Sequence, residues 1–140
     1  MKISEYIFLF STFLVLLSCE ENIITECEES QNTSSLTTFN SIQINVFDQS
    51  CAFSGCHAGS NPQANLLLTT GNSYSKLVNV TSILNPSFKL VEPGNSENSF
   101  LIKMLKHTGE STSQMPPAGK LSEGKIDSIA AWINRGAINN

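Results

Sequence analysis

Two cysteines and a histidine lie within seven residues of this chain, in the order Cys51-Ala-Phe-Ser-Gly-Cys56-His57. A histidine directly after a cysteine is the demanding part of the c-type haem attachment pattern, Cys-x-x-Cys-His. In that pattern two thiols bond the porphyrin, and the adjacent imidazole reaches the iron from the same side. About a hundred residues bury limited apolar surface, so a bound haem would form a substantial part of the core.

The spacer between the two cysteines is four residues rather than two. Cysteines at i and i+3 share one helical turn, whereas cysteines at i and i+5 do not. The two extra residues must therefore bulge, and Ser54-Gly55 offers the backbone freedom for this.

Three other interpretations of these residues stay open. Cys51 and Cys56 could form a disulfide in an oxidising compartment. Cys27 could pair with either of them, which would abolish double haem attachment. A zinc site could combine Cys51, Cys56 and His57 with Cys27 or His107, although adjacent ligands fit poorly to the usual spaced pairs.

A haem held by histidine on one side often takes methionine on the other. Met115 lies in a polar loop, and Pro116 and Pro117 stiffen its backbone into an extended geometry that suits a presented ligand. Met104 lies on an apolar helix face, where we expect it to pack in the core. At the end of the same helix, we expect His107 to interact with the helix dipole rather than with iron.

Residues 1–18 have the layout of a signal peptide. Lys2 supplies a positive start, and an apolar run over 7–17 follows, which is shorter than the roughly 20 apolar residues of a membrane-spanning helix. The run closes at Cys19 in a sequence that resembles the bacterial lipobox, whose cysteine is acylated. We therefore expect an exported protein anchored by lipidated Cys19 to the cell membrane or the outer membrane, facing the periplasm or the exterior.

The net charge of −4 is concentrated in the segment 19–38, a polar stretch without hydrophobic periodicity that we expect to be a disordered tether. Residues 39–140 form the predicted domain. They carry seven Lys and Arg residues against six Asp and Glu residues. This near neutrality makes nucleic acid an unexpected partner.

Within 39–140, apolar periodicity predicts about four short helices with long loops. The first starts at a cap on Asn40 or Ser41 and runs through Asp48. The others are expected over 73–80, from Asn95 or Ser96 to Lys106, and from a cap at Ser122 to a stop at Gly136. Core positions are Ile42, Val46, Phe47, Ile126, Ile129, Ala130, Trp132 and Ile133. Candidates for a haem crevice are Leu66, Leu67, Leu68, Phe88, Leu101 and Leu105.

The order of these elements resembles the small class I-type cytochrome c domains of bacteria. That family has a helix ending in the haem motif, a Leu-rich stretch, a turn with Pro-Gly before a helix, a Met-Pro loop, and a last helix ending in Trp-Ile-x-x-Gly-Ala. This chain carries the heptad 51–57, Ala64–Leu68, Val91–Gly94 with Ser99, Gln114–Pro117 and Ile129–Ala137. The four-residue haem spacer departs from the family.

The resemblance implies an all-α, cytochrome c-like domain with one covalent haem c per chain. Cys51 and Cys56 would carry the thioethers, with His57 and Met115 as the axial ligands. The implied function is electron transfer with redox proteins at the membrane, and not enzymatic catalysis. Two alternatives are a haem-less lipoprotein that acts as a structural or interaction module, and a haem enzyme or gas sensor in which Met115 leaves the iron open.

Overall fold

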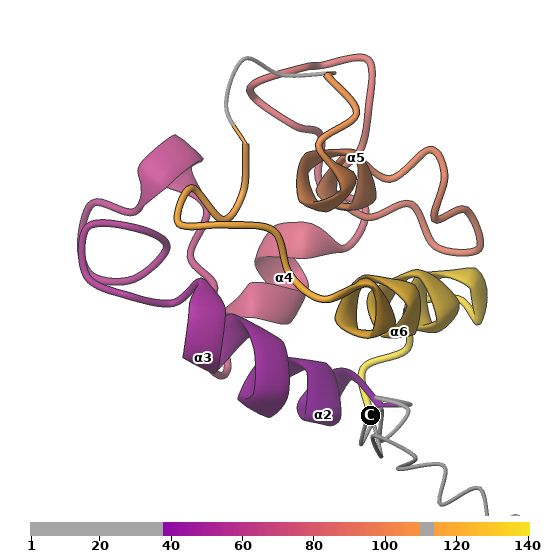
Figure 1. Cartoon of the computed structure of the whole chain (residues 1–140), viewed down its shortest axis with the longest axis horizontal. Helices are drawn as coiled ribbons and strands as arrows, with labels where there is room; N and C mark the ends of the chain where they lie inside the picture. The colour runs from indigo at the N-terminus through magenta and orange to yellow at the C-terminus, as the bar shows by residue number, and fades with distance from the viewer. Residues whose placement is uncertain (1–37, 110–113) are drawn as a thin grey trace, which may run out of the picture. The chain divides into compact units, whose positions relative to one another are not determined.

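The computed structural model describes residues 38–109 and 114–140, and helices are the regular structure of this part of the chain (Figure 1). The first helix is continuous through three labelled segments, and three further helices follow. The elements are α2 (Phe39–Ile42), η2 (Gln43–Phe47), α3 (Asp48–Ser50), a 3-10 turn η3 (Gln63–Asn65), α4 (Ser73–Leu77), α5 (Phe100–Lys106) and α6 (Glu123–Asn134). The predicted signal peptide and residues 19–37 of the predicted tether, with Cys19 and Cys27, lie outside the described residues. Thr38, assigned to the tether, is instead part of the domain.

No strand occurs in the described residues, where extended segments pair only at isolated β-bridges such as that between Val78 and Val91. The expectation of a small, mostly helical domain with about four short helices and long loops is therefore confirmed.

The first helix starts two or three residues earlier than expected. Thr38 is its N-cap, and the Thr38 hydroxyl oxygen accepts a hydrogen bond from the Ser41 amide at 3.1 Å. The Phe39 amide donates to the Asn140 side chain at 3.0 Å. Since the first free amides find these partners, the helix does not need a cap at Asn40 or Ser41. The same contacts bring the C-terminal residue beside the start of α2, as Figure 1 shows.

A buried glutamine ties the first helix to the segment that follows the heptad. Gln43 begins the π-helical turn η2 and is 3% exposed. Its amide nitrogen donates to the Asp48 carboxylate and to the Leu68 carbonyl, and the Ser73 hydroxyl donates to its amide oxygen. With its polar atoms satisfied, this side chain can be buried without the cost of an unpaired group.

The last helix matches its prediction closely. Ser122 occupies the N-cap position of α6, and Gly136 follows the helix with a positive φ of 98°. Buried positions lie on one face, namely Ile126, Ile129, Trp132 and Ile133, with Ala130 partly buried beside them. This face packs against α2 and α5.

An aromatic contact joins the first and last helices. The Phe39 and Trp132 ring centroids lie 5.1 Å apart, and Trp132 is 1% exposed. The Trp132 indole N–H donates to the Ile138 carbonyl at 2.8 Å, which folds the chain end back onto α6. Trp132 is therefore a core residue, as the sequence indicates.

The two middle helices are shorter than predicted. α4 ends at Leu77, because the chain then becomes extended and Val78 forms its bridge with Val91. α5 starts at Phe100, so the start predicted at Asn95 or Ser96 is wrong. The buried Ser99 hydroxyl donates to the Asn95 carbonyl and accepts from an amide, and these bonds hold the preceding residues in a turn.

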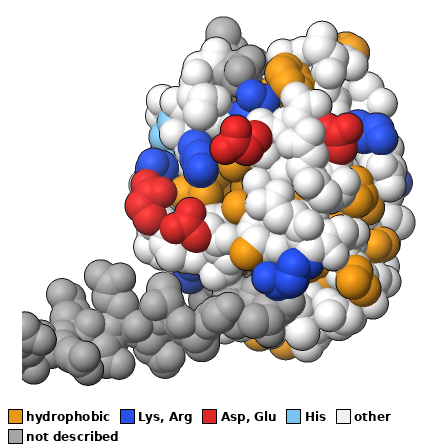
Figure 2. Space-filling view, turned by 90° about the vertical axis from the view of Figure 1, so that its right-hand side faces the viewer, with side chains coloured by type: hydrophobic (Ala, Val, Ile, Leu, Met, Phe, Trp, Pro, Cys, Tyr) orange, Lys and Arg blue, Asp and Glu red, His pale blue; other side chains and the backbone are white. Residues whose placement is uncertain are grey.

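The surface mixes both signs of charge. Figure 2 shows basic and acidic side chains interspersed on one face, together with scattered apolar ones. None of the helices in the described part of the chain has both the length and the hydrophobicity of a membrane span.

Candidate functional site

A cavity of about 580 Å³ lies among the described helices and loops. Its lining comes from the first helix, the heptad loop, α4, α5 and the loop around Met115. Most of the lining side chains are aliphatic or aromatic. All four predicted cofactor-binding residues, Cys51, Cys56, His57 and Met115, line this one cavity.

The heptad forms a compact loop at the end of the first helix. Cys51 follows α3, where the chain leaves the helix. The loop then closes on itself, because the His57 amide donates to the Cys51 carbonyl at 3.2 Å and the Cys56 amide donates to the Phe53 carbonyl at 3.0 Å. Gly55 adopts φ +80°, a left-handed geometry that favours glycine. These hydrogen bonds close a loop that contains all four spacer residues, and both cysteines and the histidine line the cavity.

Both thiols of the loop are free, and Cys51 and Cys56 are each half-buried. Burial raises the pKa of Cys51 to about 11, and the neighbouring Cys56 adds to this rise while Lys125 opposes it. Cys51 is therefore a protonated thiol at neutral pH. In the structure the two sulfurs are not bonded to each other, in contrast to the disulfide alternative.

One ring nitrogen of His57 forms a hydrogen bond with the backbone. Nδ1 lies 3.0 Å from the Leu66 carbonyl oxygen. A carbonyl can only accept, so Nδ1 carries a hydrogen, and in the neutral imidazole the lone pair is then on Nε2. A backbone carbonyl on the second ring nitrogen is the usual arrangement for a histidine that binds a metal. The Leu68 amide donates to the His57 carbonyl at 2.8 Å and holds the backbone as well.

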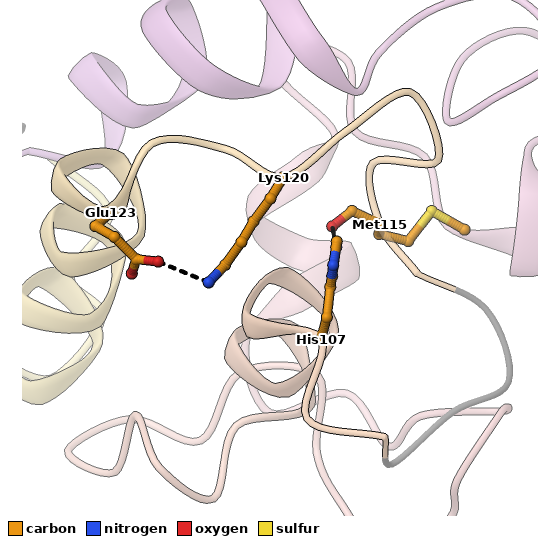
Figure 3. A network of polar contacts seen from close by, with 4 residues as sticks. All are labelled: His107, Met115, Lys120 and Glu123. Carbon is orange, nitrogen blue, oxygen red and sulfur yellow. Dashed lines mark hydrogen bonds and ion pairs between the residues drawn. The ribbon is translucent and has the colours of Figure 1, made fainter.

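Met115 enters the cavity lining together with Pro116 and Pro117. Its main chain is held by His107, whose Nε2 lies 3.2 Å from the Met115 carbonyl oxygen (Figure 3). As the sequence predicts, His107 lies at the end of α5, where it occupies the C-cap position. It adopts the left-handed conformation, with φ 57°, and its ring points to the Met115 loop.

The end of this loop is joined to α6 by an ion pair, also shown in Figure 3. The Lys120 ammonium donates to the Glu123 carboxylate at 2.6 Å. This hydrogen bond, with the charge of Lys120, lowers the pKa of Glu123. A carboxylate in the first turn also suits the positive end of the helix dipole.

Met104 plays a part that the sequence did not indicate. It is 8% exposed, as expected for a core residue, but it also lines the cavity. The cavity thus has two methionines, and the preference for Met115 over Met104 depends on loop geometry rather than on access.

The predicted crevice is correct in part. The lining includes Leu66, Leu68, Leu101 and Leu105. Leu67 and Phe88 are not among the lining residues. Phe88 instead stacks on Phe100, with ring centroids 6.1 Å apart.

Sequence reasoning did not assign several apolar residues to the lining, among them Ile83 and Leu84. Ile83 and Leu84 border the cavity, although they are 66% and 53% exposed. The signal that could have revealed them is two adjacent aliphatic residues in a Ser, Asn and Pro context, where a solvated loop would be polar.

The described residues do not assemble a metal site of the zinc type. Within 38–109 and 114–140, no three His, Cys, Asp or Glu side chains are grouped so that they could hold a metal ion together. Cys27, the possible further ligand or disulfide partner, lies outside these residues.

The cavity is therefore lined by two cysteine thiols, one histidine imidazole and two methionine thioethers, and the rest of its walls are largely apolar. Soft sulfur and imidazole ligands suit iron in a haem, and apolar walls suit a flat aromatic cofactor. Comparison of the chain with family models, with curated proteins and with solved structures found no significant match.

Proposed function

We propose that this chain is an electron carrier whose helical domain holds one covalently attached haem c. The observation that carries this proposal is the meeting of Cys51, Cys56, His57 and Met115 at a single cavity. These residues come from two loops separated by more than fifty positions. Their convergence is what the resemblance to class I-type cytochrome c domains implies.

The cavity suits a group of this kind in size and chemistry. Its volume of about 580 Å³ falls within the range of roughly 300–1,000 Å³ that is usual for small-molecule and cofactor sites. The arrangement of elements also supports a cytochrome c-like fold. The heptad ends the first helix, the Met-Pro loop precedes the last, and these two helices pack together through Phe39 and Trp132.

Each side chain has a defined part in holding the cofactor. The Cys51 and Cys56 thiols would each add across a vinyl group, the sulfur forming a bond to one carbon and the thiol hydrogen passing to the other. His57 would bind iron through Nε2, because Nδ1 is engaged by the Leu66 carbonyl. Met115 would bind iron through its thioether sulfur.

Bound haem supplies an iron centre that takes up and releases a single electron. If His57 and Met115 both bound the iron, no coordination position would be left for a substrate. The apolar lining restricts water around the cofactor, and a methionine ligand raises the reduction potential. These features favour electron transfer over catalysis or gas binding.

The proposed location follows from the N-terminal segment. Acylation of Cys19 would tether the domain to the membrane, where its partners would be other redox proteins. Radiolabelled fatty acid should be incorporated into the full chain and not into a Cys19→Ala variant. Equal labelling of both would contradict the tether.

The cofactor assignment is tested by producing the full chain together with a c-type maturation system. We expect the mass of one haem to be added, and the denatured protein to keep its haem stain. Cys51→Ala with Cys56→Ala should abolish that stain. A colourless product, or a Cys51–Cys56 disulfide in the purified protein, would contradict the proposal.

The axial ligand is tested by a matched pair of methionine variants. Met104→Leu and Met115→Leu make the same change at two methionines that line one cavity. We expect Met115→Leu alone to let the reduced protein bind carbon monoxide readily and to lower its potential. If the unmodified protein already binds the gas as readily, the open-site alternative is correct. If Met104→Leu has the larger effect, Met104 is the ligand.

A further inference from the structure

The C-terminal end of α5 carries a side chain that reaches the Met115 loop. The His107 amide is held by the carbonyls of Lys103 and Met104, so its position is set by the helix itself. From there Nε2 approaches the Met115 carbonyl oxygen to 3.2 Å. Figure 3 shows the ring between the helix end and the Met115 backbone, with the Met115 sulfur on the side away from the ring.

The chemistry of this contact fixes its direction. A carbonyl oxygen only accepts, so Nε2 carries the hydrogen and donates it. Among the described residues, no other group forms a hydrogen bond with the main chain of Met115. On the other side of Met115, Pro116 and Pro117 have fixed φ angles, and the Gly119 amide closes a turn onto the Pro116 carbonyl at 3.3 Å.

We propose that His107 is a positioning residue for Met115, holding the backbone from which the thioether is presented to the iron. The inference rests on the proposed function. A ligand that is ordered before it binds loses less conformational freedom on binding, so its bond to the metal is harder to displace. His107 would therefore set how firmly Met115 stays on the iron.

Two substitutions separate the hydrogen bond from the backbone conformation. Asparagine tolerates the left-handed region better than most residues, but its amide is too short to replace Nε2. Glutamine places its amide nitrogen close to the position of the imidazole Nε2, yet tolerates this backbone less well. If His107 matters only for the backbone conformation, His107→Asn should resemble the unmodified protein more closely than His107→Gln does. If it positions Met115 through the hydrogen bond, His107→Gln should resemble the unmodified protein more closely.

The experiment uses the full, haem-loaded chain and its His107→Asn and His107→Gln variants. Three properties are measured, namely carbon monoxide affinity of the reduced protein, reduction potential, and the far-red absorption band of a methionine–ferric haem bond. A neutral hydrogen bond changes an equilibrium by roughly three- to tenfold. We expect His107→Asn to bind carbon monoxide more tightly by about that factor, with a weaker band and a lower potential. His107→Gln should stay within about twofold of the unmodified protein.

A readout without iron comes from the haem-free chain. Nitrogen NMR of its imidazoles should show His107 in the tautomer protonated at Nε2. The opposite tautomer would overturn the proposed contact.

The remaining outcomes are also decisive. Equal gas affinity in all three proteins, or a change in His107→Gln alone, overturns the positioning role. If the unmodified protein lacks haem, or if Met115→Leu leaves its spectrum unchanged, the proposed function fails first and the inference falls with it. The Met115→Leu measurement thus distinguishes the two failures.

Discussion

His57 and Cys51 show how backbone groups prepare side chains for chemistry. The Leu66 carbonyl selects the His57 tautomer, and the turn that starts at Cys51 returns the chain so that both thiols and the imidazole reach one cavity. Sequence reasoning identified these residues because adjacent Cys and His are a local pattern. It could not identify the carbonyl of Leu66, because any residue has a carbonyl and only the fold decides which one is near.

The same limit applies to His107. Its place at the end of a helix was predictable from the apolar spacing of 100–105, and a histidine there is commonly explained by the helix dipole. The contact with Met115 depends on the left-handed conformation of His107, which turns its ring away from the helix. No spacing pattern in the chain encodes that turn.

The raised pKa of Cys51 leads to a prediction for the haem-free protein. The thiolate is the reactive form, and burial raises the pKa of this thiol from 9.0 to about 11. We therefore expect alkylation of Cys51 by iodoacetamide to stay slow at pH 8–9 and to accelerate as the pH rises towards 11. Peptide mass mapping resolves Cys51 from the other cysteines.

The sign of the pH effect on stability follows from the same shift. The folded state holds the Cys51 proton more tightly than the unfolded state, so it loses stability as the pH rises above about 9, where the unfolded thiol ionises. Alkylation in denaturant is the control, since the thiol should then react at the lower pH. Fast modification of Cys51 in the folded protein at pH 8 would contradict its burial.

At the scale of elements, helices were predictable where hydrophobic spacing and end signals agree. Ser122, the stripe of Ile126, Ile129 and Ile133, and Gly136 all indicate one helix, and α6 is found there. The start of α5 was predicted wrongly, since Ser99 uses its hydroxyl to bond the turn before it. A polar residue that can cap a helix can equally hold a turn, and the difference depends on which backbone groups are close.

The π-helical turn η2 could not be predicted either. Its residues, Gln43–Phe47, satisfy ordinary helical spacing, with Val46 and Phe47 buried. The wider turn places Gln43 where its amide reaches Asp48 and Leu68. These are contacts of the folded domain, and they are absent from the local pattern of apolar residues.

The junction between α2 and α6 gives a prediction for stability. Trp132→Phe removes the indole N–H that bonds the Ile138 carbonyl and leaves space beside Phe39. We expect a loss of about 2 kcal/mol in the free energy of unfolding, which combines an unpaired carbonyl with a small cavity. Urea unfolding followed by circular dichroism measures it, because Trp132 is the single tryptophan and the variant has no indole fluorescence.

A matched control for this change is Ile138→Ala. The Ile138 side chain is 57% exposed, while its backbone carbonyl stays available to Trp132. Its unfolding free energy should therefore remain within about 0.5 kcal/mol of the unmodified protein. A larger loss in Ile138→Ala than in Trp132→Phe would mean that the apolar tail, and not the indole hydrogen bond, stabilises this junction.

At the scale of the whole molecule, the arrangement of the helices leaves the cavity between them. The first helix and α6 pack directly through Phe39 and Trp132, whereas α4, α5 and the loops border a space of about 580 Å³. This space is partly open to solvent, and its largely apolar walls and sulfur and imidazole side chains suit a bound group.

This leads to a prediction for the same chain with and without haem. A cofactor that contacts the cavity walls in the folded state adds apolar burial that the haem-free domain lacks, so the loaded protein should be more stable. For a domain of this size, about 1 kcal/mol shifts the melting temperature by about 4–8 °C. We expect loading to raise the melting temperature by at least about 10 °C, corresponding to roughly 2 kcal/mol or more. Circular dichroism of protein made with and without the maturation system measures the shift. A Cys51→Ala, Cys56→Ala variant made with that system should melt like the haem-free chain, and equal melting temperatures for all samples would mean that no group fills the cavity.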